Sequence, residues 1–323
     1  MNLFTLFGRI AIDDKGATSK IDSVTNTARR SEGIIGSSFS KIRKVIAAAF
    51  TVKSIVGFEK KIISTYATYD DQMRKVAAVS GATGKAYDDL RNKAEELGRS
   101  TRFSATEAGE GMEALARAGW KTSDIINETG NVLNFASANS IELGQAAELV
   151  SDGLNQFGLS AKDTQYFTDV LSQTAASSST DVLGLKESLE NTSGMVKTFG
   201  YDLEDISVAL GTMGDESIKG GKAGTQLNSA FMNMAKGGKD VQSAMKDLGI
   251  SLYDAQGNAK PLNEVLGDLR GAFANLTDEQ KAQYASTLFG QTGMKGMMSV
   301  IEASDEKFND LTDAIANSTG KTK

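Results

Sequence analysis

The sequence predicts a mainly α protein: a multi-helix array of short, glycine-interrupted helices, with a short N-terminal strand and one β-hairpin near residues 250–262. Two extremes of composition support this fold class. The 323 residues include one proline, where average usage of about 5% would give roughly 16, and proline is a strong helix breaker. They include 33 glycines, where average usage of about 7% would give roughly 23. We therefore expect many short helices that end at glycines.

A repeat in the middle of the chain is the third observation. Amphipathic helices break there at Gly119, Gly158 and Gly200, which lie 39 and 42 residues apart. Trp120 follows the first glycine and Tyr201 follows the third. Periods near 40 residues are typical of repeats built from two helices. We therefore expect three helix pairs, with these five residues at structural helix-break positions.

An aspartate follows each of these glycines by five residues: Asp124, Asp163 and Asp205. In the second and third copies a capping residue stands three positions earlier, Ser160 or Asp202. A carboxylate in the first turn of a helix is stabilised by the exposed amides and by the helix dipole. We therefore interpret the aspartates as residues that start helices, and not as catalytic acids or metal ligands.

No pattern in the chain is typical of catalysis. There is no cysteine and no histidine, which removes thiol nucleophiles, Cys/His zinc sites and a Ser-His-Asp relay. The glycine-rich residues 219–225 do not have the spacing of a phosphate-binding loop. The loop after Asp254 lacks the glycine and glutamate positions of an EF-hand. We therefore expect no enzyme activity, no cofactor and no bound metal.

Charge and sequence texture divide the chain into three predicted domains. Residues 1–65 hold 11 basic and 5 acidic residues, which leaves 24 basic and 36 acidic residues for the remainder. Such asymmetry is typical of a basic arm on an acidic body. We expect a strand and an amphipathic helix in this arm, a helical core with the three repeats at 66–248, and the hairpin plus C-terminal helices at 249–323.

Residues 40–63 are predicted to form a basic amphipathic helix that is a candidate for binding a partner or a membrane. Its apolar and basic positions are Ile42, Val45, Ala49, Val52, Val56, Lys41, Arg43, Lys44 and Lys53. The apolar run of 14 residues is shorter than the ~20 that span a bilayer. An interfacial membrane helix, a coiled-coil seam and packing against the rest of the chain remain three open interpretations.

The last third of the chain changes texture. Alternating residues at 250–254, turn residues at 256–258 and the single proline, Pro261, predict the β-hairpin. Helices are expected at 263–276, 277–289 and 296–317, followed by an unstructured tail.

Four segments in order carry a family resemblance between Met73 and Ala303. They read FSATEAGEGMEALARAGW, IKGGKAGTQLNSAFMNMA, LGISLYDAQGNAKPLNEVLGDLRGAF and YASTLFGQTGMKGMMSVIEA. This succession resembles the core of the tail tape measure proteins of long-tailed bacteriophages and prophages, and the opening LFGRIAID is similar to their N-termini. Members of that family usually run much longer, so we expect this chain to be an N-terminal portion.

The resemblance implies a non-enzymatic scaffold that sets tail length during assembly, occupies the lumen of the tail tube in the virion and leaves ahead of the DNA at infection. The implied partners are tail tube proteins, tail assembly chaperones, tail tip or baseplate proteins and further copies of the chain, first in the host cytoplasm. It also implies contact with the host membrane, whereas nucleic acid is expected only at the basic N-terminal arm. The alternative function is a membrane-active helical protein that works through residues 40–63.

Overall fold

A computed structural model describes residues 52–320 and 322. The secondary structure of these residues consists of thirteen α-helices and one short 3-10 helix, with no β-strand among them. The chain divides into two compact units, residues 1–71 and residues 72–323. The prediction of a mainly α fold is confirmed for the described residues. The predicted N-terminal strand lies outside them, and the domain boundaries at 65 and 248 remain predictions.

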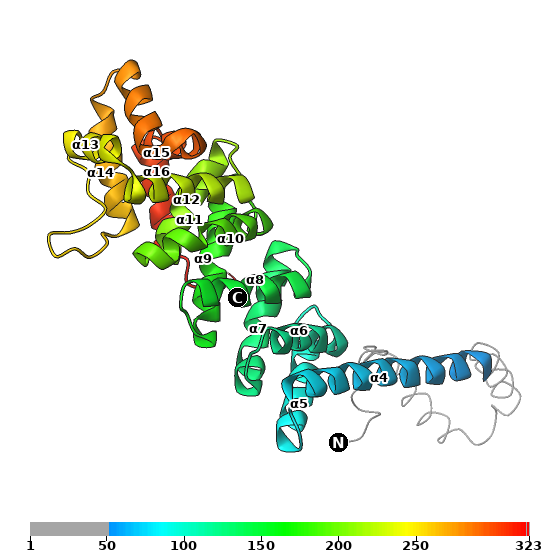
Figure 1. Ribbon diagram of the computed structural model, residues 1–323. Coiled ribbons are helices and arrows are strands. Elements are labelled where there is room, and N and C mark those ends of the chain that lie inside the picture. The colour runs from blue at the N-terminus through cyan, green and yellow to red at the C-terminus, as the bar shows by residue number, and fades with distance from the viewer. Residues whose placement is uncertain (1–51, 321, 323) are drawn as a thin grey trace, which may run out of the picture. The chain divides into compact units, whose positions relative to one another are not determined.

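Successive helices of the second unit stack in two alternating layers. Each helix from α5 to α10 contacts both the next helix and the next but one, so that α6, α8, α10 and α12 form one layer and α5, α7, α9 and α11 the other. This is the packing of helical repeat proteins, in which each unit buries the apolar face of its neighbour. Figure 1 shows this succession from cyan to yellow-green. The bounds are α4 (Val52–Ser80), α5 (Lys85–Ser100), α6 (Ala105–Arg117), α7 (Thr122–Asn139), α8 (Leu143–Gln156), η1 (Ala161–Asp163), α9 (Thr164–Ser177), α10 (Val182–Phe199), α11 (Leu203–Asp215) and α12 (Gly221–Lys236).

The remaining helices fold back over the end of this array. They are α13 (Lys239–Asp247), α14 (Leu262–Ala274), α15 (Asp278–Ile301) and α16 (Asp305–Ala316). Helix α15 packs along α12 and also contacts α11, α13 and α14. Helix α16, red in Figure 1, returns to α11 and α9. The last helix therefore lies against helices that precede it by about 100 residues or more.

Glycines permit the closest helix crossings in the second unit. A Cβ atom at Gly224 on α12 would overlap the carbonyl oxygen of Ser188 on α10, and one at Gly293 on α15 would lie 2.7 Å from the Cβ of Ala230 on α12. Because backbone and not a flexible side chain lies opposite, neither crossing could accept an alanine without a shift. The glycines of two family-like segments therefore have a packing role.

The predicted β-hairpin is wrong in its extent. Between α13 and α14 the described residues form a single antiparallel bridge, Tyr253 with Ala259. The carboxylate of Asp254 accepts the amides of Gln256 and Asn258 at 2.9 and 2.8 Å. These bonds close the turn at its tip, and backbone hydrogen bonds from Asp254 to Asn258 and from Lys260 to Leu252 lie on either side of the bridge. The segment is a loop that folds back on itself.

The predicted break after Phe289 is confirmed: α15 consists of two helical segments that meet at a kink at Gly290. Gly290 has φ 64° and ψ 174°, a conformation that is essentially restricted to glycine. The amide of Asn233 on α12 donates to the carbonyl oxygens of Thr287 and Leu288 at 3.0 and 2.8 Å. Since these bonds satisfy acceptors next to the kink, α15 continues beyond it to Ile301 and a separate helix begins at Asp305. The prediction of one helix over 296–317 is therefore wrong.

The prediction of an unstructured tail is also wrong for two of its residues. The amides of Gly320 and Thr322 both donate to the carboxylate of Asp169 on α9. The signal was invisible in the sequence because the partners are more than 150 positions apart.

Candidate functional site

The three glycines that interrupt the repeat lie within two residues of the ends of α6, α8 and α10. Gly119, Gly158 and Gly200 have φ angles of 86°, 66° and 70°, a left-handed conformation that residues with a Cβ rarely adopt. The amide of Gly200 donates to the carbonyl oxygen of Val196 at 2.8 Å, which closes the last turn of α10. These positions provide backbone geometry and no reactive group.

The two aromatic residues beside these glycines have different surroundings. Trp120 is half-buried and lines a cavity of about 200 Å³ with Leu154, at the joint between the first two helix pairs. Tyr201 is buried and stacks on Phe199 with ring centroids 5.0 Å apart, while Phe231 meets it edge-on at 5.5 Å. Burial raises the pKa of the Tyr201 hydroxyl. Trp120 therefore lies at a surface cavity, and Tyr201 lies in a buried aromatic cluster with Phe199 and Phe231.

The three aspartates are not equivalent. Asp163 forms a capping box with Ser160, whose hydroxyl and amide both donate to its carboxylate and lower its pKa. Asp205 accepts the amide of Asn263 at 3.0 Å, and its pKa is raised by burial and by neighbouring acidic side chains. Asp124 lies in the first turn of α7 without a side-chain cap beside it. All three belong to helix starts, and Asp205 also joins α11 to α14.

The candidate partner or membrane helix is only partly described. Lys41, Ile42, Arg43, Lys44, Val45 and Ala49 lie outside the described residues. Val52, Lys53 and Val56 belong to α4, whose backbone is described at these positions. No helix in residues 52–320 is both long and apolar enough to cross a membrane.

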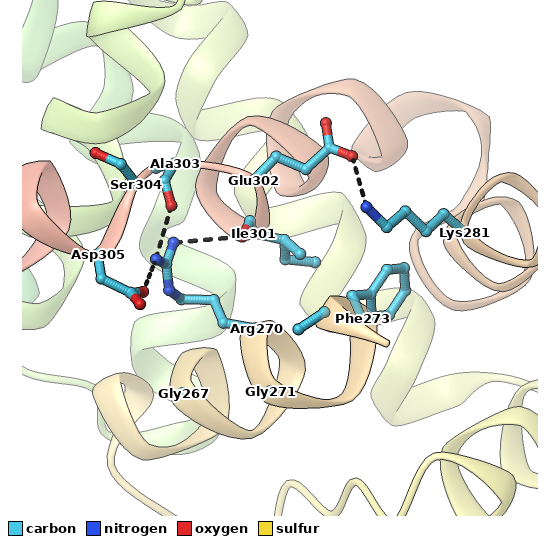
Figure 2. Close-up of a pocket in the computed structure, with 11 residues that line it drawn as sticks. Gly267, Arg270, Gly271, Phe273, Lys281, Ile301, Glu302, Ala303, Ser304 and Asp305 are labelled. Atoms are coloured by element: carbon cyan, nitrogen blue, oxygen red, sulfur yellow. Dashed lines mark hydrogen bonds and ion pairs between the residues drawn. The ribbon is translucent and has the colours of Figure 1, made fainter. Parts of the chain in front are cut away.

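A cavity of about 620 Å³ lies between α14, the start of α15 and the junction of α15 with α16 (Figure 2). Its α14 wall is low because Gly267 and Gly271 have no side chains, and a Cβ at either position would meet nothing within 4 Å. Lys281 and Glu302 form an ion pair of 3.7 Å across its rim. The complete lining is Gly267, Arg270, Gly271, Phe273, Ala274, Lys281, Ile301, Glu302, Ala303, Ser304 and Asp305.

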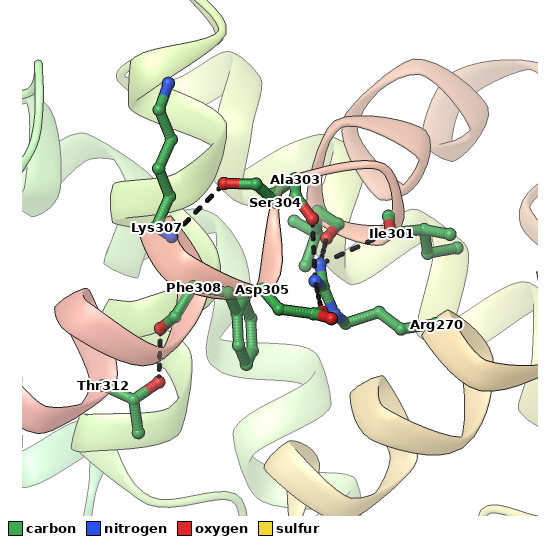
Figure 3. Close-up of polar contacts among 9 residues, drawn as sticks. Arg270, Ile301, Ala303, Ser304, Asp305, Lys307, Phe308 and Thr312 are labelled. Atoms are coloured by element: carbon green, nitrogen blue, oxygen red, sulfur yellow. Dashed lines mark hydrogen bonds and ion pairs between the residues drawn. The ribbon is translucent and has the colours of Figure 1, made fainter. Parts of the chain in front are cut away.

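Arg270 fastens the two helices that meet at this cavity (Figure 3). Its guanidinium donates to the carbonyl oxygens of Val300 and Ala303 at 2.6 and 2.7 Å, where α15 ends. It also binds the carboxylate of Asp305, at the start of α16, at 2.6 Å. The same group lies 4.7 Å from the ring centroid of Phe308. Carbonyl groups at a helix C-terminus carry partial negative charge, so Arg270 satisfies the end of one helix and positions the next.

The charged side chains at this cavity are engaged in ion pairs. Arg270 pairs with Asp305, and Lys281 pairs with Glu302. The described residues contain no group of three or more carboxylates that could hold a metal ion. The cavity therefore combines positively and negatively charged side chains with the glycines and the alanine of α14.

A carboxylate of the same chain lies at the glycine-rich start of α12. The carboxylate of Glu187 on α10 accepts the amide of Gly221 at 3.3 Å. A helix N-terminus attracts anions, and here a side chain of the same chain takes that place. The glycine-rich, basic residues 219–225 therefore have a role in joining α12 to α10.

Sequence reasoning did not find Arg270, Asn233 or Glu187. One signal was available for Arg270, because it is the only arginine after Arg117 among many lysines, and arginine alone offers a planar fork of donors. Asn233 and Glu187 act across helix–helix contacts, and the sequence contains no local pattern that marks them.

Comparison with known proteins gives a consistent result. Residues 91–290 match the model of a family described as phage-related minor tail protein. The whole chain is 32% identical to the tape measure protein of Pneumococcus phage Dp-1, and 72% of it is 29% identical to the probable tape measure protein of Escherichia phage P2. A probable tape measure protein of Clostridium phage phiCD119 is 23% identical over 80% of the chain.

The aligned region covers 28% of the length of the Dp-1 relative and 29% of the other two. No solved structure matches the chain. The family match spans α6 to α14 completely, together with parts of α5 and α15. It therefore includes the repeat, the close crossing of α10 with α12, and Arg270.

Proposed function

We propose that this chain, which belongs to the phage-related minor tail protein family and is a phage tail tape measure protein, forms a non-enzymatic part of the scaffold that sets tail length. The family match over residues 91–290 carries the proposal. The absence of a catalytic constellation among residues 52–320 is compatible with it. In this function the chain acts as a folded scaffold that contacts other tail proteins and catalyses no reaction.

We further propose where the protein acts and with what. Tail tube proteins polymerise around it, assembly chaperones cover it beforehand in the host cytoplasm, and tail tip or baseplate proteins hold one end. In the virion it occupies the lumen of the tail tube, in several copies, and it leaves ahead of the DNA. The relatives' names support a tail context, and these individual partners are inferred from the family resemblance.

The first experiment deletes the codons for residues 72–323 in the phage or prophage that encodes the protein. Tails are then expected to be absent or irregular in length in electron micrographs, and wild-type protein supplied in trans should restore one uniform length. Normal tails in the deletion strain would refute the proposed function.

The second experiment tests whether the helix packing of the chain is needed for tail assembly. Gly224→Ala should reduce tail yield because it disturbs the crossing of α10 and α12, whereas Gly144→Ala, on an open face of α8, should leave yield and length normal. Peptides of the chain should be found by mass spectrometry in purified virions, protected from added protease until DNA has been ejected. Cleavage in intact tails would contradict a position in the lumen.

A further inference from the structure

Asp169 on α9 is 1% exposed, and its carboxylate receives a distant segment of the same chain. Its Oδ2 accepts the amide of Gly320 at 2.6 Å, and its Oδ1 accepts the amide and the hydroxyl of Thr322 at 2.9 and 2.8 Å. Gln165, one turn earlier on α9, donates to Oδ1 at 2.8 Å. Four donors therefore converge on one buried carboxylate, and three of them belong to the returning segment.

These donors determine the charge of the buried group. Burial by itself would raise the pKa of Asp169, but the hydrogen bonds from Gln165, Thr322 and Gly320 outweigh it and hold the pKa below its ordinary value. An ionised carboxylate without partners in such a place would be strongly destabilising. The segment after α16 thus supplies most of what allows Asp169 to be buried and charged.

The segment is shaped for this contact. Gly320 has a φ angle of 84°, which places its amide and that of Thr322 on the same carboxylate without the strain that a larger residue would suffer. Ser318 and Thr322 are 5% and 3% exposed. The hydroxyl of Thr322 also accepts a hydrogen bond from Gln165 at 2.8 Å. A glycine followed two positions later by a threonine is therefore the pattern that fits the site.

The contact has a consequence for α16, because that helix is fastened at both ends. Arg270 holds its start through Asp305, and Asp169 holds the segment that follows its end. Between these points α16 packs on α9 and α11, and Leu311 and Ile315 are buried.

We propose that Ser318, Gly320 and Thr322 form a latch: they belong to an intramolecular segment that docks on buried Asp169 and fixes α16 against α9 and α11. The latch joins the last helix of the unit to the middle of the helical array. With the latch open, α16 keeps only its attachment at Arg270 and its packing contacts, so it separates from α9 more readily.

Hydrogen exchange read by mass spectrometry on the full chain tests the latch. In Asp169→Asn the peptides covering residues 305–322 are expected to exchange about tenfold faster or more, the change expected when charge-assisted hydrogen bonds are lost. Thr322→Val removes one donor and should accelerate the same peptides. Peptides from α5 to α8 should not change in either variant.

Thr319→Val is the matched control, because Thr319 is exposed three positions from Thr322. It should exchange as wild type does. The double variant Asp169→Asn with Thr322→Val should exchange no faster than Asp169→Asn alone, since both changes open the same contact. If Asp169→Asn accelerates exchange throughout the second unit, the test rests on the comparison of Thr322→Val with Thr319→Val. The latch is refuted by equal exchange in those two variants, or by unprotected amides at Gly320 and Thr322 in wild type.

Discussion

Single atoms decide whether the helices of the array can meet. At Gly224 the backbone of α12 approaches the carbonyl oxygen of Ser188 so closely that one methyl group would overlap it. At Gly267, by contrast, the space above the backbone is open. Both residues are helical glycines in family-like segments, and the sequence alone does not distinguish them.

Gly224→Ala is expected to lower the free energy of unfolding by about 1–3 kcal/mol, the usual cost of overpacking a tight contact. Gly267→Ala is the control and should raise the free energy of unfolding by about 0.5–1 kcal/mol, since alanine favours a helix more than glycine does. Urea unfolding followed by circular dichroism measures both. A shift in the same direction for both variants would contradict the packing argument.

Asp163 and Asp205 occupy equivalent positions in the repeat but differ in electrostatics. The pKa of Asp163 is lowered by Ser160, whereas burial and nearby acidic groups raise that of Asp205. The stabilisation from Asp163 is therefore present above its unfolded pKa and lost as pH falls through the folded value. For Asp205 the sign is opposite, and stability is lost as pH rises through its raised value.

We therefore expect Asp163→Asn to lower stability at neutral pH by about 0.5 kcal/mol, a small effect because the group is exposed. Asp205→Asn should not lower it, since the neutral amide retains an acceptor for Asn263 without a buried charge. Urea unfolding at neutral pH and near pH 3 measures both differences, which should shrink in acid. Equal losses for the two variants at neutral pH would refute the distinction.

At the scale of whole elements, the kink in α15 depends on a side chain from another helix. Gly290 supplies the unusual backbone conformation, and Asn233 of α12 satisfies two carbonyl oxygens beside it. The sequence indicates a break after Phe289, since a glycine follows a helical pattern there. It predicts that the next helix begins at 296, whereas the helix resumes directly after Gly290 beside a donor more than 50 residues away.

Asn233→Ala should lower the free energy of unfolding by about 1–3 kcal/mol, because it leaves acceptors without partners in a partly buried place. Asn309→Ala, on the exposed face of α16, provides the control and should have little effect. Differential scanning calorimetry measures both. If the two variants melt together, Asn233 does not support the kink.

For the molecule as a whole, local signals predicted local features. The sequences Ser104-Ala105-Thr106-Glu107 and Thr277-Asp278-Glu279-Gln280 have the capping-box pattern, and both capping boxes are present. Contacts between distant segments were not predictable, because hydrogen bonds such as those of Arg270 and Asp169 leave no periodicity in the chain. The hairpin was predicted too long, because pairing in the described residues is limited to the bridge of Tyr253 with Ala259 beside the turn that Asp254 closes.

The candidate site shows the same division. Glycine breaks such as Gly119 could be located from spacing and neighbours, and the structure places them at helix ends. The cavity beside Arg270 could not, since three separate stretches of chain build it. Local sequence patterns therefore locate helix ends more readily than contacts between distant helices.

The return of the chain to Asp169 also determines how the second unit carries tension. A force applied between residues 72 and 322 passes through the early helices to α9 and then directly across the latch. The 151 positions between Asp169 and Gly320 form a closed loop that bears no load while the latch holds. When it opens, the load passes to the packing of α16 on α9 and α11, and the loop reaches its full length of about 500 Å at ~3.4 Å per residue only if its helices also unfold. The few hydrogen bonds at this single carboxylate would therefore be the first contacts that the unit loses under tension.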